Sequence, residues 1–254
     1  MSTLSTLFSQ KKTYVGYFTA GDGGFEKSLS IMKAYAESGI DIIEVGVPFS
    51  DPVADGPVIQ AAATRAIMDS HFTLKNVLEL IKTFKMHYDT AIVLFSYFNP
   101  IMQFSVEHDF FKEAQLAGVD ACLVVDLPLE EASDYREHCI HAGIDPIYVI
   151  SNSTPLSRIE ALSQLGRGML YYACRNGVTG IKQALPTEFV EKISEIKAHS
   201  TLPVVVGFGV SNKETARNIL NYADGFVVGS LFVKAAHDKT DQELRQLIVS
   251  LDPR

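Results

Sequence analysis

Three carboxylates lie close together in the segment Ile43–Val58, which reads Ile-Glu-Val-Gly-Val-Pro-Phe-Ser-Asp-Pro-Val-Ala-Asp-Gly-Pro-Val. Glu44 stands within an apolar run, whereas Asp51 and Asp55 follow among prolines and glycines that are typical of a loop. Burying an unpaired carboxylate in a strand removes its hydration, which costs free energy or raises the pKa of the group. Glu44 is therefore a candidate general acid and base.

Each of these carboxylates also has a structural interpretation. Glu44 would be structural if a buried neighbour paired with it, and Asp55 would be structural as a turn residue or a helix cap. Asp51 precedes Pro52 and is typical of a turn former. These alternatives remain open from the residues alone.

Glycines form a second chemical pattern, because they follow the apolar runs in the last third of the chain. The segments are Gly207-Phe208-Gly209 and Gly229-Ser230, and Gly180 lies in the loop before them. Bare backbone N–H groups next to helix N-termini bind phosphate, so these positions predict a phosphate site. The alternative is that the glycines only allow tight turns.

The positions of the histidines and lysines argue against metal catalysis and against a Schiff-base mechanism. No histidine falls at the end of a predicted strand, so we expect no metal site, and no lysine lies within one, so we expect no Schiff base. We therefore expect a site without metal or cofactor that transfers protons on a small phosphorylated substrate. The histidines are His71, His87, His108, His138, His141, His199 and His237.

Eight short apolar runs alternate with helical patterns along the chain. Most runs are continuous rather than alternating, as in parallel strands buried on both faces. The pattern predicts an α/β fold, namely a (β/α)8 TIM barrel with an extra N-terminal helix over Leu4–Gln10, in one domain covering residues 1–254. An open doubly wound sheet is the competing fold, but no GxGxxG follows the first strand. The expected strands are Tyr14–Thr19, Asp41–Val47, Ala91–Tyr97, Ala121–Asp126, Pro146–Ile150, Met169–Ala173, Pro203–Gly207 and Gly225–Val228.

Composition limits the partners and the compartment. A net charge of −8 argues against nucleic acid or an anionic membrane surface as the main partner. Three cysteines without CxxC spacing favour a reducing compartment, and no apolar run approaches the ~20 residues that span a bilayer. We expect a cytoplasmic protein that binds neither membrane nor nucleic acid.

The run Glu44-Val-Gly-Val-Pro-Phe-Ser-Asp-Pro-Val-Ala-Asp-Gly-Pro resembles a signature of the tryptophan synthase alpha subunits. Asp126-Leu-Pro, Gly177-Val-Thr-Gly, Gly207-Phe-Gly-Val and Val228-Gly-Ser match further family positions in the same order. The resemblance implies a lyase of tryptophan biosynthesis that cleaves indole-3-glycerol phosphate to indole and glyceraldehyde 3-phosphate by a retro-aldol step.

The resemblance also implies roles for particular residues. Glu44 would be the general acid and base, and Asp55 would accept the indole N–H. Tyr171, Phe208, Leu123, Ile59, Tyr97 and Thr179 would contact the substrate. Gly180, Gly209, Gly229 and Ser230 would bind its phosphate.

The family further implies an α2β2 assembly with a beta subunit. Pyridoxal phosphate (PLP) would belong to that partner, because this chain has no lysine placed like a PLP site. The loop Asn99–Gln103 would contact the partner through an exposed apolar pair.

Two other functions remain as hypotheses. One is a barrel isomerase or aldolase that acts on a sugar phosphate, against which Asp55 and the apolar residues Ile59, Leu123 and Phe208 favour an aromatic substrate. The other is a barrel that only binds and regulates a beta subunit, against which the presence of both Glu44 and Asp55 argues.

Overall fold

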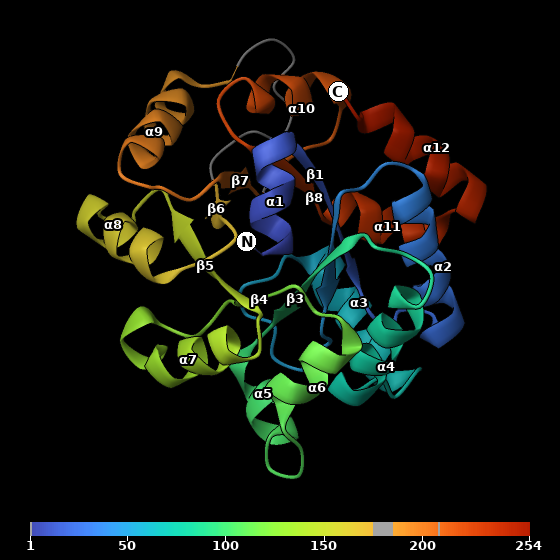
Figure 1. The fold of residues 1–254 in the computed structure, drawn as a ribbon. Coiled ribbons are helices and arrows are strands. Elements are labelled where there is room, and N and C mark those ends of the chain that lie inside the picture. Colours follow the sequence, from blue (N-terminus) through green and yellow to red (C-terminus); the bar gives the residue numbers. More distant parts are fainter. Residues whose placement is uncertain (1, 175–184, 208) are drawn as a thin grey trace.

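The computed structural model describes residues 2–174, 185–207 and 209–254, and its eight parallel strands close into a barrel in sequence order (Figure 1). Strand β1 pairs with both β2 and β8, which closes the sheet and confirms the predicted (β/α)8 fold. The strands are β1 (Thr13–Thr19), β2 (Ile42–Gly46), β3 (Ala91–Ser96), β4 (Ala121–Val124), β5 (Asp145–Ser151), β6 (Leu170–Ala173), β7 (Val204–Val206) and β8 (Gly225–Val228).

Helices cover the outside of the barrel, and the predicted N-terminal helix is present as α1 (Thr3–Gln10). The other helices are α2 (Gly24–Glu37), α3 (Pro57–Met68), α4 (Leu74–Lys85), α5 (Phe98–Phe104), α6 (Phe110–Ala117), the 3-10 turn η1 (Leu129–Glu131), α7 (Ser133–His141), α8 (Leu156–Leu165), α9 (Thr187–Ala198), α10 (Lys213–Leu220), α11 (Ser230–Asp238) and α12 (Asp241–Leu251).

The segment after β3 differs from the sequence prediction. Asn99–Gln103 was expected to form a loop, but it belongs to helix α5. Pro100 is in the first turn of this helix, where the missing N–H of proline costs nothing. Ile101 is buried and Met102 is 54% exposed, so the expected exposed apolar pair is wrong for Ile101.

Aspartates at helix-to-strand joints fasten neighbouring strands to one another. Asp41 Oδ2 accepts a hydrogen bond from the backbone N–H of Tyr14 at 2.8 Å. Asp120 likewise accepts the backbone N–H of Ile92 on β3, and Asp224 accepts that of Val204 on β7. These carboxylates satisfy strand ends that have no partner in the sheet, so they align the strands at the N-terminal end of the barrel.

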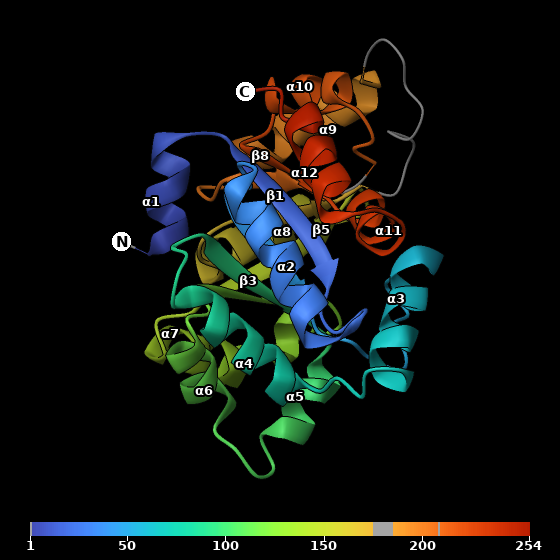
Figure 2. The same cartoon turned by 90° about the vertical axis from the view of Figure 1, so that its right-hand side faces the viewer.

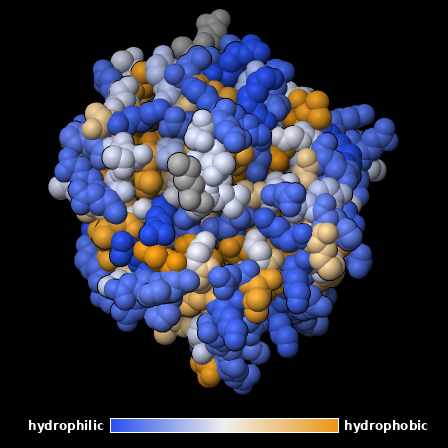
Figure 3. Space-filling model, in the orientation of Figure 1, coloured by the Kyte–Doolittle hydropathy of each residue, from blue (hydrophilic) through white to orange (hydrophobic). Residues whose placement is uncertain are grey.

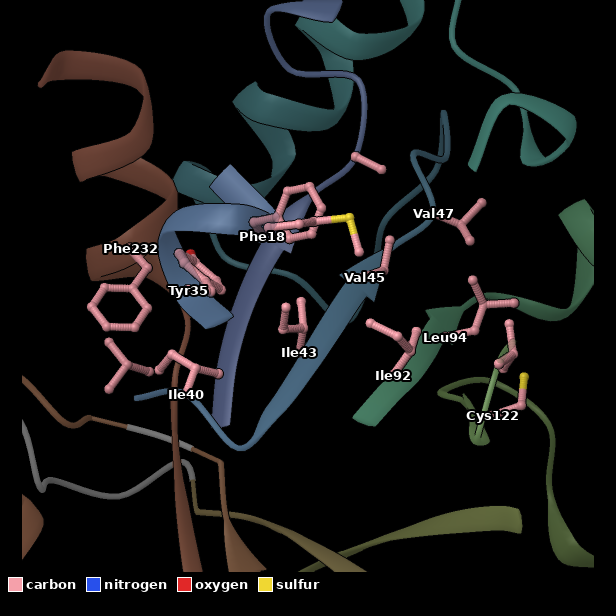
Figure 4. Packing of buried hydrophobic residues seen from close by; sticks show 14 of the residues in the cluster. Phe18, Tyr35, Ile40, Ile43, Val45, Val47, Ile92, Leu94, Cys122 and Phe232 are labelled. Carbon is pink, nitrogen blue, oxygen red and sulfur yellow. The ribbon is translucent and has the colours of Figure 1, made fainter. Parts of the chain in front are cut away.

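Two apolar clusters lie on either side of the sheet. The outer cluster fills the space between strands and helices, where Phe18 and Ile43 pack near Tyr35 of α2 and Phe232 of α11 (Figure 4). The inner cluster fills the barrel with alternate residues of the same strands, as the period of two requires. It includes Val15, Tyr17, Ile42, Ala91, Val93, Ala121, Leu123, Ile147, Met169, Val205 and Val227.

Helix α1 lies across the N-terminal ends of the strands, as Figures 1 and 2 both show. The loops that follow the strands emerge at the opposite end, which is the end where barrel enzymes place their chemistry. The face that carries α1 is largely hydrophilic on its outside (Figure 3). Among the described residues, no helix is both long and apolar enough to span a bilayer.

Candidate active site

Glu44 is the middle residue of β2 and points into the barrel. Its backbone is in register with Tyr17 on β1 and Val93 on β3, and both of these residues belong to the inner cluster. The side chain is 0% exposed, and among the described residues neither carboxylate oxygen has a hydrogen-bond partner. Burial alone raises the pKa of Glu44 to about 8. Within the described residues the structure therefore shows no partner for a buried structural pair, and the raised pKa favours the protonated form near neutral pH.

Two tyrosines lie beside Glu44, and each depends on a neighbouring glycine. A β-carbon at Gly46 would overlap the ring and hydroxyl of Tyr17, and one at Gly207 would overlap the ring and hydroxyl of Tyr171. Only glycine leaves room for these rings at the C-terminal end of the barrel. The pKa of Tyr171 is raised, first by burial and then by the negative charges that Glu44, Tyr17 and Asp55 carry when they are ionised. Tyr171 and the two carboxylates are therefore close enough to interact electrostatically.

An aromatic wall continues around the barrel from these tyrosines. The Phe95 ring on β3 lies edge-on to Tyr17, with ring centroids 5.4 Å apart, and at 6.4 Å from Tyr171. Leu123 on β4 is fully buried in the same inner cluster, and Ile59 on α3 packs against it. The structure thus brings Tyr171, Leu123 and Ile59 together on one apolar surface with Glu44.

Asp55 lies in the loop between β2 and α3, and Tyr97 holds it there. The Tyr97 hydroxyl donates a hydrogen bond to Asp55 Oδ2 at 2.8 Å and accepts one from the backbone N–H of Ala54 at 3.0 Å. The Tyr97 ring is buried and packs on Phe49, with centroids 5.0 Å apart. Burial raises the pKa of Asp55, whereas the hydrogen bond from Tyr97 lowers it. Asp55 is thus a partly buried acceptor with a fixed orientation.

Other acidic residues near the strand ends have structural partners. Asp22 forms a two-point ion pair with the guanidinium of Arg65 on α3, at 2.7 and 2.6 Å. Asp126 accepts the backbone N–H of Phe98 at 2.7 Å and so caps α5. Asp51 is exposed, and its backbone carbonyl accepts the N–H of Val53 in a tight turn. These contacts agree with structural roles for all three residues.

The glycines predicted to bind phosphate follow two adjacent strands. Gly209 comes after β7 and has φ of +76°, whereas Gly229 comes after β8 and is the N-cap of α11. Ser230 is the first residue of α11 and is exposed. Because β7 and β8 pair in parallel, both loops leave the barrel at the same end as Glu44. The first N–H groups of an α-helix have no partner within the helix, so the start of α11 offers donors of the kind that an anion site requires.

Three predicted site residues, Thr179, Gly180 and Phe208, lie outside the described residues. Tyr17, which is in register with Glu44, and Phe95, whose ring contacts Tyr17 and Tyr171, were not predicted as site residues. The alternation of side chains between the two faces of each strand would identify both residues, provided that the register of the strands with Glu44 is known. Within the described residues, no group of three or more His, Cys, Asp or Glu side chains is placed to hold a metal ion.

Known proteins resemble this chain along its whole length. The sequence model of a family described as tryptophan synthase alpha chain matches residues 4–252. A protein named tryptophan synthase alpha chain from Coxiella burnetii (strain CbuK_Q154) is 48% identical over 254 residues, covering 100% of this chain and 98% of the relative. One of the same name from Chlamydia felis (strain Fe/C-56) is 39% identical over 259 residues, covering 100% of both chains.

Solved structures also superpose closely on this chain. Tryptophan synthase subunit alpha from Legionella pneumophila str. Paris superposes with a TM-score of 0.89 at 32% identity, over 99% of this chain and 97% of that one. A chain from a structural study of the mutual activation of the tryptophan synthase a2b2 complex of Pyrococcus furiosus has a TM-score of 0.88 at 33% identity, over 95% of this chain and 98% of that one.

Proposed function

This chain belongs to the tryptophan synthase alpha chain family, and from that premise we propose how its own residues carry out the reaction. The chain is a lyase of tryptophan biosynthesis that cleaves indole-3-glycerol phosphate to indole and glyceraldehyde 3-phosphate. The bond that breaks joins C3 of the indole ring to the first carbon of the glycerol phosphate. Its cleavage needs a place for the electron pair to go, and a ring protonated at C3 is such a place.

Glu44 supplies and recovers the proton in our proposal. The carboxylic acid first protonates C3 of the indole ring, which leaves a positively charged ring. The resulting carboxylate then accepts the proton of the adjacent glycerol hydroxyl while the carbon–carbon bond breaks. The bonding electron pair returns to the ring, the hydroxyl carbon becomes the aldehyde, and Glu44 is protonated again.

The observation that carries this proposal is the buried carboxyl of Glu44, which has no hydrogen-bond partner among the described residues. An ordinary glutamate with pKa near 4.5 would be almost fully ionised at neutral pH and so could not act as the first acid. The pKa of about 8 keeps the proton on Glu44. The same raised pKa makes the conjugate carboxylate a stronger base for the hydroxyl proton in the next step.

Asp55 has the complementary role. It accepts the indole N–H and so stabilises the positive charge that protonation at C3 places on the ring nitrogen. The hydrogen bond from Tyr97 orients the Asp55 carboxylate and favours its ionised form. We therefore assign Tyr97 to the site through Asp55.

Apolar walls and a phosphate cup complete the proposed site. Tyr171, Leu123 and Ile59 would enclose the flat indole, a surface to which Phe95 also contributes. Gly209, Gly229 and Ser230 would bind the phosphate through backbone N–H groups. The sequence resemblance supports the same roles for Phe208, Thr179 and Gly180.

We propose a beta subunit as the partner, in an α2β2 complex like the one named for the Pyrococcus furiosus protein. Pyridoxal phosphate would be held by that subunit, and this chain would use no cofactor of its own. Among the described residues, Cys122, Cys139 and Cys174 are buried and form no disulfide, which supports a cytoplasmic, reducing location.

Indole release from indole-3-glycerol phosphate, measured with and without the beta subunit, tests the reaction and the partner together. We expect Glu44→Gln to abolish indole formation while beta-subunit binding is retained, because the amide has no proton to give. Asp55→Asn should reduce turnover by several orders of magnitude. Substantial turnover in Glu44→Gln, or a loss below about tenfold (~1.4 kcal/mol) in Asp55→Asn, would remove that residue from its role.

A further inference from the structure

We propose that Leu4 of helix α1 is a positioning residue for the reaction, because it closes the floor of the barrel beneath Glu44 and excludes water from that carboxyl. The proposal rests on the proposed role of Glu44 and concerns the opposite end of the barrel from the substrate. Helix α1 is outside the eight-fold repeat of strands and helices. Its position across the strand ends gives it a function beyond covering the fold (Figure 2).

Helix α1 is built with one apolar face. Leu4, Leu7 and Phe8 follow the spacing i, i+3 and i+4, so their side chains share one side of the helix. Leu4 is 0% exposed and belongs to the inner barrel cluster, against which Leu7 and Phe8 also pack. The Ser2 hydroxyl caps the helix by accepting the N–H of Ser5 at 3.3 Å. The helix is thus oriented with its apolar face into the barrel.

The floor and the carboxyl are separated by a short distance. Ile42 lies two residues before Glu44 on β2 and faces the same way, and its register partner on β3 is Ala91. At about 3.3 Å of rise per residue, the layer of Ile42 and Ala91 is roughly 7 Å below Glu44. A β-carbon at Gly168 would be 3.0 Å from Leu4 Cδ2, so Leu4 fills the floor as far as the start of β6.

A polar pocket, open to solvent, lies between α1 and the N-terminal ends of β2 and β3. It has a volume of about 550 Å³ and runs along α1, where Gln10, Lys11 and Asp41 give it polar walls. It is large enough and polar enough to hold several water molecules. Its lining includes Leu7 and Ala91, and Ala91 also belongs to the inner cluster. The apolar face of α1 therefore separates water from the interior that contains Glu44.

The groups around Glu44 explain why this partition matters. Among the described residues, the titratable groups that interact with Glu44 are Tyr17 from β1 and Tyr171 from β6, and both of these also interact with Asp55 from the loop after β2. The remaining strands and α1 present apolar side chains, namely Val93, Leu123, Ile147, Val205, Val227 and Leu4. Burial is the cause of the raised pKa of Glu44, so its protonation depends on the dryness of the interior.

A second buried carboxyl, that of Asp145, lies near the floor, and its effect on the pH profile must be distinguished from that of Glu44. Asp145, at the start of β5, is 3% exposed, and its Oδ2 atom has no hydrogen-bond partner within the part of the chain that the structure describes. The Asp145 side chain and Leu4 both lie against Gly168. A change at Leu4 can therefore affect both carboxyls, and the test includes a variant without the charge of Asp145.

Leu4→Ser is the principal test, with the complete alpha–beta complex and indole-3-glycerol phosphate. We expect the basic limb of the kcat/KM profile, which lies near the Glu44 pKa of about 8, to move at least one pH unit lower. If the apparent pKa of this limb falls from about 8 to about 7, activity at pH 8 should be about fivefold lower than in the native chain, with little change at pH 6. The variant Leu4→Gln, which keeps most of the volume but brings an amide to the floor, should move the limb the same way, and Leu4→Met should leave it in place.

Two controls separate this effect from general damage. Leu244→Ser removes an equally buried leucine from the outer cluster on α12 and should leave the limb unmoved. Asp145→Asn should also leave it unmoved. An unmoved limb in folded Leu4→Ser and Leu4→Gln, or an equal movement in Leu244→Ser, overturns the proposal for Leu4. Activity in Glu44→Gln would instead overturn the role of Glu44 itself, so the two failures are distinguishable.

Discussion

Replacing Glu44 by glutamine removes the buried titrating group but keeps its shape, which allows the raised pKa to be measured as a stability. In the unfolded chain this carboxyl has its ordinary pKa of 4.5, whereas in the folded chain the value is about 8. Between these two pH values the folded chain holds a proton that the unfolded chain has lost. The free energy of unfolding of the native chain must therefore fall as the pH rises from 4.5 to 8.

The size of this effect follows from the two pKa values. Each pKa unit corresponds to about 1.4 kcal/mol, so the full loss is on the order of 5 kcal/mol. Because titration of the unfolded chain is already under way at pH 5.5, about 3 kcal/mol of the loss falls between pH 5.5 and pH 8.5. Glu44 is fully buried, so solvent screening does not reduce this figure.

The assay is urea unfolding followed by circular dichroism at several pH values from 5.5 to 8.5, for the native chain and Glu44→Gln. Asp55 and Asp145 also have raised pKa values, but both variants contain them, so the difference between the two curves isolates Glu44. We expect the glutamine variant to gain about 3 kcal/mol relative to the native chain over this range. A difference that stays constant with pH would refute a raised pKa for Glu44 and with it the acid role.

Two further substitutions test the surroundings of the carboxylates. The Tyr97 hydroxyl donates a hydrogen bond to Asp55 that lowers the pKa of this carboxyl, and Tyr97→Phe removes it. The acidic limb of the kcat/KM profile should therefore move to higher pH, and turnover should fall about ten- to hundredfold. An unchanged acidic limb would argue against this role of Tyr97. Gly207→Ala places a methyl group in the Tyr171 ring and should destabilise the chain by about 1–3 kcal/mol in urea unfolding. If the overlap is the cause, that loss should nearly vanish in a Tyr171→Ala background, whereas additive losses would contradict it.

Much of the fold could be predicted because it depends on local pattern. Continuous apolar runs separated by helical spacing indicated eight parallel strands, and the structure has all eight close to the expected positions. Helix α5 was missed because Asn99-Pro100 is typical of a turn, although proline is compatible with a first helical turn. What stabilises this start is the carboxylate of Asp126, which lies beyond the next strand. No local pattern contains that contact.

The candidate site, like the fold, could be predicted where it depends on residue type and could not where it depends on contacts between strands. Glu44 stood out because a carboxylate within an apolar run is chemically unusual wherever the strand lies. The same run could not show whether the carboxylate had a partner, because any partner would come from another strand. In residues 2–174, 185–207 and 209–254 the structure gives neither oxygen a partner, and burial accounts for the raised pKa. Tyr97 was expected as a substrate contact, but only the folded chain brings its hydroxyl to Asp55.

The sequence by itself determined the barrel architecture and the family and marked both carboxylates as candidates, since each of these depends on residue type and spacing along the chain. Tertiary structure decided which side chains face Glu44. Tyr14 and Tyr17 are both buried on β1, yet Tyr14 lies in the outer cluster and Tyr17 beside Glu44. It also decided that α1 lies across the barrel floor. The physical reason is that closure of the sheet sets one register for all eight strands, and only that register assigns each residue to the inner or the outer face.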